Sequence, residues 1–241
     1  MFAPAVLLAC AATPFVPAAE SAAEPPRVVI YGGTSGGIAA AIQAKRMGAD
    51  VVLLEPSSHL GGLTTGGLGA TDIGNKAAIG GLSLEFYTRV GKHYADRANW
   101  VQEQPEDYRS RRNAVNLDPE NPQPFWTFEP HVASTIYAAM LAEAGVSPLM
   151  NSPLDRSPGG VQKTDGRITS IRLKDGTLVQ GDVFLDATYE GDLLAASGVS
   201  YHVGREAEAV YGESYNGVRP KLNYKNHRFV KNVDPYVVPG D

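Results

Sequence analysis

The stretch RVVIYGGTSGGIAAAIQ, residues 27–43, decides the fold of this 241-residue chain. It begins with the apolar run Val28–Tyr31, continues with four glycines in six residues, and ends in an alanine-rich segment with isoleucines at positions 38 and 42. The apolar run predicts a buried strand, and isoleucines four residues apart predict one face of a helix over about Gly36–Met47. Strand, glycine turn and helix form the first part of a βαβ unit.

An acidic residue ends the next strand, at a fixed distance in sequence from the glycine turn. Val51–Leu54 is apolar throughout, which is typical of a strand covered on both faces, and Glu55 ends it, 18 residues after Gly37. This spacing matches that of dinucleotide-binding proteins. In those proteins the amides of the turn and a helix N-terminus bind the diphosphate, and the acid accepts hydrogen bonds from ribose hydroxyls. Thr34 stands where G-x-G-x-x-G has its second glycine, so we expect a looser fit or a hydroxyl donor there.

Beyond this unit the chain predicts further helices and a small antiparallel sheet. Helices are expected over 83–95 and from Pro130 to about Gly145, with an irregular excursion over about 70–128. A third apolar segment at 146–150 is weakened as a strand by a proline. Two Asp-Gly pairs, at 165–166 and 175–176, predict a three-stranded meander that runs into VFLDAT, residues 183–188, an apolar run of buried-strand type. The fold class is therefore α/β, with a central parallel sheet and a β-meander.

Composition excludes several classes of function. The net charge of −5 without a long basic run argues against nucleic acid as a partner. Cys10 is the single cysteine, so the rest of the chain holds no disulfide and no thiol nucleophile. The five histidines lack the close pairing of metal motifs, and we expect no metal site. After residue 23, no apolar run approaches the roughly 18 residues of a membrane span.

The glycine turn also fits a second pattern. Residues 33–37, GTSGG, satisfy G-x-S-x-G, the nucleophile elbow of α/β-hydrolases, and Asp186 and His202 follow Ser35 in hydrolase order. Only a leader-like segment precedes the turn, however, whereas a hydrolase sheet begins several strands earlier. The turn is also compatible with an NAD-binding Rossmann dehydrogenase, with a non-catalytic nucleotide-binding module, and with a glycine-rich turn that binds nothing.

Several stretches together resemble one family. Residues 28–69, VVIYGGTSGGIAAAIQAKRMGADVVLLEPSSHLGGLTTGGLG, resemble the N-terminus of FAD-dependent oxidoreductases of the glutathione-reductase-like fold, within them an exported bacterial group. DATYEGDLLAASG, residues 186–198, resembles the D-A-T-G-x-G-D segment of that fold, with Tyr189 and Glu190 in place of the usual residues. The resemblance covers about residues 27–215 and includes a second glycine pair, Gly61-Gly62.

The resemblance implies non-covalently bound FAD and a set of cofactor-binding residues. Glu55 is expected at the adenosine ribose, the first glycine turn at the pyrophosphate, and residues 61–66 toward the isoalloxazine. For His59, which raises the question of a covalent flavin bond, a loop or phosphate contact is expected instead. The full expected set is Gly32, Gly33, Thr34, Ser35, Gly36, Gly37, Glu55, Pro56, Gly61, Gly62, Leu63, Thr64, Thr65, Gly66, Ala187, Thr188 and Asp192.

The implied chemistry is hydride or electron-pair transfer between FAD and a small organic substrate, carried by the flavin itself. Candidate substrate-side groups are Tyr189, Glu190 and His131, whereas Glu190 and Asp192 could instead satisfy nearby helix amides. The three arginines at 109, 111 and 112 are expected in a solvated loop.

The sequence also predicts how the chain is divided. Residues 1–23 resemble an export leader, with Cys10 in a lipoprotein-like context, which predicts a periplasmic or extracellular protein. Residues 24–200 are expected to form the FAD-binding domain and 201–241 the start of a substrate domain. The family resemblance implies a longer protein, with Asp241 as a truncation point.

Overall fold

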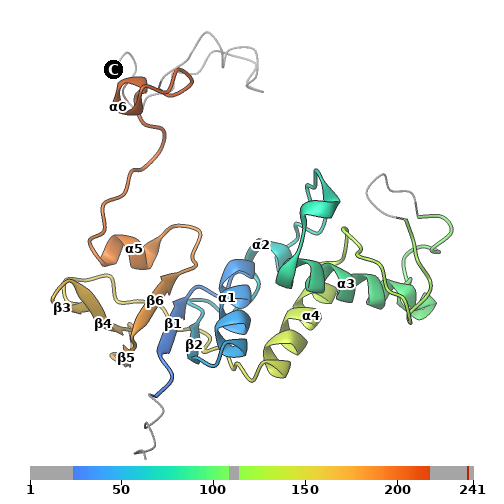
Figure 1. The fold of residues 1–241 in the computed structure, drawn as a ribbon, viewed down its shortest axis with the longest axis horizontal. Helices are drawn as coiled ribbons and strands as arrows, with labels where there is room; N and C mark the ends of the chain where they lie inside the picture. The colour runs from blue at the N-terminus through green and yellow to red at the C-terminus, as the bar shows by residue number, and fades with distance from the viewer. Residues whose placement is uncertain (1–23, 109–113, 218–237, 239–241) are drawn as a thin grey trace, which may run out of the picture.

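A parallel sheet of three strands organises the computed structural model, which describes residues 24–108, 114–217 and 238 (Figure 1). The strands are β1 (Arg27–Tyr31), β2 (Asp50–Leu54) and β6 (Val183–Asp186), in the order β2-β1-β6. β1 is central and is paired in register with β2 from Arg27 opposite Asp50 to Tyr31 opposite Leu54. The predicted βαβ unit is confirmed, with α1 over Ser35–Arg46.

The alternation of side chains along β1 divides the core into two layers. Val28 and Ile30 pack in the cluster on the helical face, whereas Val29 and Tyr31 pack in the cluster under the meander. All four are buried, because a central strand with a layer on each face has no solvent side. This two-sided burial explains why the run has no polar residue.

The helical layer contains α1, α3 (Gly81–Ala95) and α4 (Pro130–Glu143), which lie on one side of the sheet in Figure 1. Pro130 begins α4, as expected, and the helix buries Val132, Ile136 and Met140. The rings of Phe86 and Tyr137 stack between α3 and α4, with centroids 4.6 Å apart.

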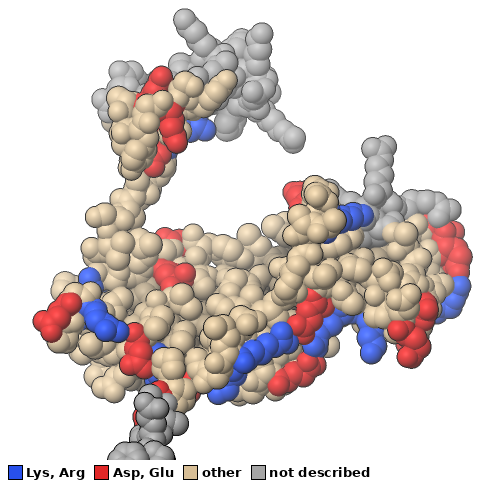
Figure 2. Space-filling model, viewed as in Figure 1, with Lys and Arg blue, Asp and Glu red and all other residues tan. Residues whose placement is uncertain are grey.

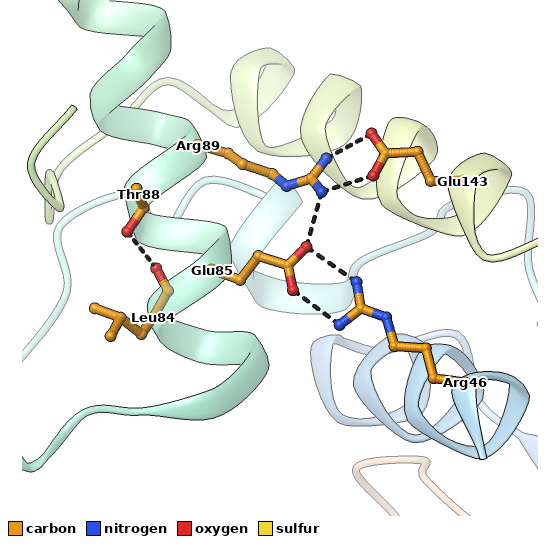
Figure 3. Close-up of polar contacts among 6 residues, drawn as sticks. All are labelled: Arg46, Leu84, Glu85, Thr88, Arg89 and Glu143. Carbon is orange, nitrogen blue, oxygen red and sulfur yellow. Dashed lines mark hydrogen bonds and ion pairs between the residues drawn. The ribbon is translucent and has the colours of Figure 1, made fainter. Parts of the chain in front are cut away.

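A charged network ties these three helices together at the surface (Figure 3). Arg46 of α1 donates to both carboxylate oxygens of Glu85 on α3, at 2.9 and 3.0 Å. Arg89 donates to Glu85 at 2.7 Å and to both oxygens of Glu143 on α4. The hydrogen bond from Arg46, reinforced by Arg89, lowers the pKa of Glu85 below its usual value.

The predicted meander covers the other face of the sheet. It consists of β3 (Val161–Thr164), β4 (Arg167–Arg172) and β5 (Leu178–Gln180), paired antiparallel in that order. Asp165 and Gly166 both adopt positive φ, as the first Asp-Gly turn requires. The segment before the meander is fastened to β1, because the Tyr31 hydroxyl accepts a hydrogen bond from the Leu154 amide at 2.8 Å. Leu154 in turn forms an isolated bridge with Leu173, which follows β4.

One expectation for a strand needs correction, and the weak strand character expected at 146–150 is confirmed. VFLDAT does not extend the meander as a buried strand: β6 pairs with β1, and Val183 and Leu185 are 44% and 39% exposed. Val183 and Leu185 lie opposite Val28 and Ile30, on the face of the helical layer. They are exposed because α1 packs against β1 and β2 rather than against β6. The segment at 146–150 forms only an isolated parallel bridge, between Leu149 and Leu54 of β2.

The remaining elements are short. The excursion over 70–128 contains the 3-10 turns η1 (Lys76–Ala78) and η2 (Arg97–Asn99), preceded by α2 (Gly62–Thr65). After β6 come α5 (Asp192–Ala196) and α6 (Glu208–Tyr211). Among the described residues, no helix has the length and hydropathy to cross a bilayer. The same residues contain no cluster of histidine, cysteine, aspartate or glutamate side chains that could hold a metal ion.

Charged side chains of both signs are mixed on the surface. Figure 2 shows Lys and Arg interspersed with Asp and Glu along the lower rim of the described part of the molecule, without a broad basic patch on the face in view. Residues 1–23, the three candidate arginines at 109, 111 and 112, and most of 218–241 lie outside the described residues.

Candidate functional site

The first glycine turn packs so tightly that only glycine fits at two of its positions. Gly32 adopts a φ of +108°, and a Cβ there would lie 2.7 Å from the backbone of Ala187 and Thr188. A Cβ on Gly37 would lie 1.9 Å from the Gly32 carbonyl oxygen. The turn is therefore pressed against both the start of α1 and the end of β6, which explains the first and last glycines of the motif.

Thr34 has a different role from the one expected. Its hydroxyl donates to the Ala187 carbonyl at 2.8 Å and accepts the Gly37 amide at 3.3 Å, so it caps α1. The proton expected to be free for a ligand is thus already donated within the chain. By satisfying the third amide of the helix, the cap leaves the amides of Ser35 and Gly36. The Ser35 amide takes part in the parallel bridge between Thr34 and Gly61, whereas the Gly36 amide makes no hydrogen bond among the described residues.

The space in front of this helix N-terminus is open. A Cβ on Gly36 would meet only the Thr34 hydroxyl, at 3.7 Å. The unpaired Gly36 amide and the positive end of a 12-residue helix dipole lie at this terminus. Such a terminus is suited to an anionic group, and a diphosphate fits it.

Glu55 is buried, with 8% of its surface exposed, and both of its oxygens are engaged. Oε2 accepts the Gly33 amide at 2.7 Å, while Oε1 accepts the amide and hydroxyl of Ser57 at 2.8 and 2.6 Å. Glu55 therefore holds the glycine turn against the end of β2. Because an ionised carboxylate has about four acceptor positions, capacity for a ribose hydroxyl remains.

The second glycine pair is joined to the first. The Gly61 amide donates to the Gly33 carbonyl at 2.7 Å, and Thr34 and Gly61 form an isolated parallel bridge. Gly61 and Gly62 have φ values of +96° and +56°, which turn the chain into α2. His59 Nε2 lies 2.9 Å from Thr65 Oγ1, so the expected loop role of His59 is supported.

A third segment, residues 186–192, completes the site. Asp186 Oδ1 accepts the amide and hydroxyl of Thr188, and the Thr188 hydroxyl accepts the amides of Gly191 and Asp192. The hydroxyl of Tyr189 accepts the Leu63 amide at 2.8 Å. Three stretches far apart in sequence thus converge at the C-terminal ends of β1, β2 and β6.

The three stretches enclose a cleft of about 280 Å³. Its lining contains seven of the seventeen expected cofactor residues, drawn from all three stretches: Gly32, Thr34, Glu55, Pro56, Gly62, Thr188 and Asp192, together with Ser57, His59, Tyr189 and Glu190. Ser35, Gly36 and Thr64 line a neighbouring hollow on the helical side instead. Asp192 forms an ion pair with Arg156 at 2.8 Å, and Asp186 Oδ2 accepts the Leu194 amide of α5. The nearby helix amide is therefore satisfied by Asp186 rather than by Glu190 or Asp192.

The hydrolase hypothesis finds no support in the contacts of Ser35. Its hydroxyl donates to the Gly61 carbonyl at 3.2 Å and lies 2.6 Å from the Thr64 hydroxyl. Neither contact is a base able to activate a nucleophile. Both hydroxyls contact Tyr137 of α4, a residue missed by sequence reasoning because its position matches an ordinary core residue; burial raises the pKa of Tyr137.

Only two of the three candidate substrate-side residues lie in the cleft. Tyr189 and Glu190 line the cleft, whereas His131 lies exposed in the first turn of α4 and is absent from the lining. Ser57 was also missed from sequence; its position two residues after a carboxylate is a signal for the local turn that it forms.

Comparison with known proteins places the chain in a family. A family model described as FAD dependent oxidoreductase matches residues 27–238, and the chain belongs to this family. The family match identifies FAD as the cofactor of the group. No curated protein sequence matches the chain.

Solved structures with similar folds include L-proline dehydrogenase from P. horikoshii, with 16% identity and a TM-score of 0.47 over 76% of this chain and 58% of that one. L-amino acid deaminase from Proteus vulgaris has 17% identity and a TM-score of 0.45 over 80% of this chain and 54% of that one. The chain thus spans little more than half the length of either protein.

Proposed function

We propose that this chain forms the cofactor-binding part of an oxidoreductase that transfers a hydride or electron pair between a small organic substrate and non-covalently bound FAD. The observation that carries the proposal is the open N-terminus of α1, with the unpaired amide of Gly36, near the buried carboxylate of Glu55 that holds the same glycine turn. Membership of the FAD dependent oxidoreductase family supports FAD over NAD as the nucleotide.

Different residues of the site bind different parts of the cofactor. The N-terminus of α1, with the Gly36 amide, binds the diphosphate. Glu55 accepts a hydrogen bond from a ribose hydroxyl while it holds the glycine turn in place. The second glycine pair and the segment around Thr188 border the flavin half. When bound, the flavin supplies the electron-pair chemistry, so the chain needs no acid–base pair of its own for that step.

Substrate-side groups are proposed only where they reach the cleft. Tyr189 and Glu190 satisfy this condition and His131 does not. We further propose that residues 24–200 form the cofactor domain, that 201–241 begin a substrate domain, and that residues 1–23 direct export. Fusing residues 1–23 to a reporter enzyme active only outside the cytoplasm tests the last point, and an inactive fusion would refute it.

A flavin titration of the whole chain tests the main proposal. The purified chain is expected to quench FAD fluorescence saturably, and to do so unchanged in the presence of excess NAD. A folded chain that binds NAD and not FAD would refute the proposal in favour of a nicotinamide-dependent dehydrogenase. Failure of the folded chain to bind either nucleotide would also count against it.

A further inference from the structure

Tyr189 connects two walls of the cleft that are 126 residues apart in sequence. Its hydroxyl accepts the Leu63 amide at 2.8 Å and lies against Gly62, where a Cβ would come within 2.3 Å of the phenolic oxygen. Gly62 is therefore glycine for two reasons, its φ of +56° and the phenol that covers it. The contact is a specific fit of one side chain on one backbone position.

The backbone that carries Tyr189 is fixed from both sides. Asp186 binds Thr188, and Thr188 in turn binds the amides of Gly191 and Asp192. Tyr189 lies within this hydrogen-bonded turn, although 57% of its own surface is exposed. An exposed tyrosine held so closely in position has lost much of its conformational entropy before a ligand arrives.

The hydroxyl of Tyr189 has an unused proton. A phenol offers one donor as well as acceptor positions, and the Leu63 amide occupies only an acceptor position. Among the described residues, no acceptor for the phenolic proton is found, and the residue lines the cleft. Accepting one hydrogen bond polarises the O–H group and strengthens it as a donor.

We propose that Tyr189 is a cofactor-positioning residue that donates its phenolic proton to the ribityl–isoalloxazine half of FAD while it holds the second glycine loop in place. This inference rests on the proposed function. The adenosine and diphosphate half already has partners in Glu55 and the N-terminus of α1, whereas Tyr189 contacts the start of α2. The flavin half offers hydroxyl and carbonyl acceptors suited to a phenol.

The test compares two cofactors on two matched variants of the full chain. Tyr189→Phe removes the hydroxyl and keeps the ring; Tyr201→Phe makes the same change at a residue that is 61% exposed and outside the cleft lining. FAD and ADP are each titrated, because ADP carries only the adenosine and diphosphate half. We expect Tyr189→Phe to weaken FAD binding about tenfold, as for one lost hydrogen bond, and to leave ADP binding within twofold.

Further readouts separate a positioning role from a structural one. Loss of a donor to the flavin is expected to shift the visible absorbance band of the bound cofactor in Tyr189→Phe but not in Tyr201→Phe, while the unliganded proteins unfold at similar temperatures. Equal weakening of FAD and ADP would overturn the inference, because it would indicate a loosened cleft. Unchanged FAD binding would overturn it as well, whereas a wild-type chain unable to bind FAD would overturn the proposed function itself.

Discussion

Placing a negative charge at Gly36 tests the diphosphate site most directly. Gly36 is the second residue of α1, has an ordinary helical backbone, and has open space where a Cβ would be built. The fold therefore accepts Gly36→Asp and its uncharged match Gly36→Asn equally well. Only the aspartate brings a carboxylate to the helix N-terminus at which the diphosphate is proposed to bind.

The two effects of the aspartate have opposite signs. In the unliganded protein the carboxylate interacts with the positive end of the helix dipole, which adds about 0.3–1 kcal/mol to the free energy of unfolding relative to asparagine. With FAD, a like charge about 5 Å away at an effective dielectric constant of about 20–40 costs about 2–3 kcal/mol. The dissociation constant for FAD is therefore expected to rise about 30- to 150-fold relative to Gly36→Asn.

The assay is a fluorescence titration of FAD against both variants, paired with urea unfolding of the unliganded proteins. We expect the more stable variant to be the weaker binder. Because repulsion is screened by salt, the difference in affinity is also expected to shrink between low and high ionic strength. If Gly36→Asp bound FAD as tightly as Gly36→Asn, the diphosphate would not lie at this helix N-terminus.

Three further substitutions test how individual contacts contribute to the free energy of unfolding. Glu85→Gln is expected to lower the free energy of unfolding by about 1 kcal/mol at pH 7. Because the hydrogen bond from Arg46 lowers the pKa of Glu85, that stability is fully present above its usual pKa of 4.5 and is lost as the pH falls through the lowered folded-state pKa. Urea unfolding of wild type and variant should therefore converge in acid. Gly37→Ala forces a Cβ onto a backbone oxygen and should cost about 3 kcal/mol or more, while Gly74→Ala, where space is open, should be near neutral by the same assay. Tyr31→Phe leaves a buried amide unpaired and should lower stability by about 1–3 kcal/mol; an unchanged midpoint would contradict the role given to its hydroxyl.

Local patterns in the sequence were sufficient for the elements that depend on neighbouring residues. The apolar run before Gly32, the isoleucine spacing of α1 and the first Asp-Gly turn each predict an element that the structure contains. The position of Glu55 was predictable for the same reason, because a strand of fixed rise brings the residue after it to the edge of the sheet.

Tertiary structure decided what depends on residues far apart in the chain. VFLDAT reads as a buried strand, yet its half-exposed surface follows from its place at the sheet edge, which no local pattern encodes. The hydroxyl of Thr34 is used by Ala187, 153 residues away, and that of Tyr189 by Leu63. The sequence alone therefore determined that a nucleotide-type turn exists. Only the packing of three distant segments determined which of its donors remain free for a ligand, because a hydrogen bond satisfied within the chain is no longer available outside it.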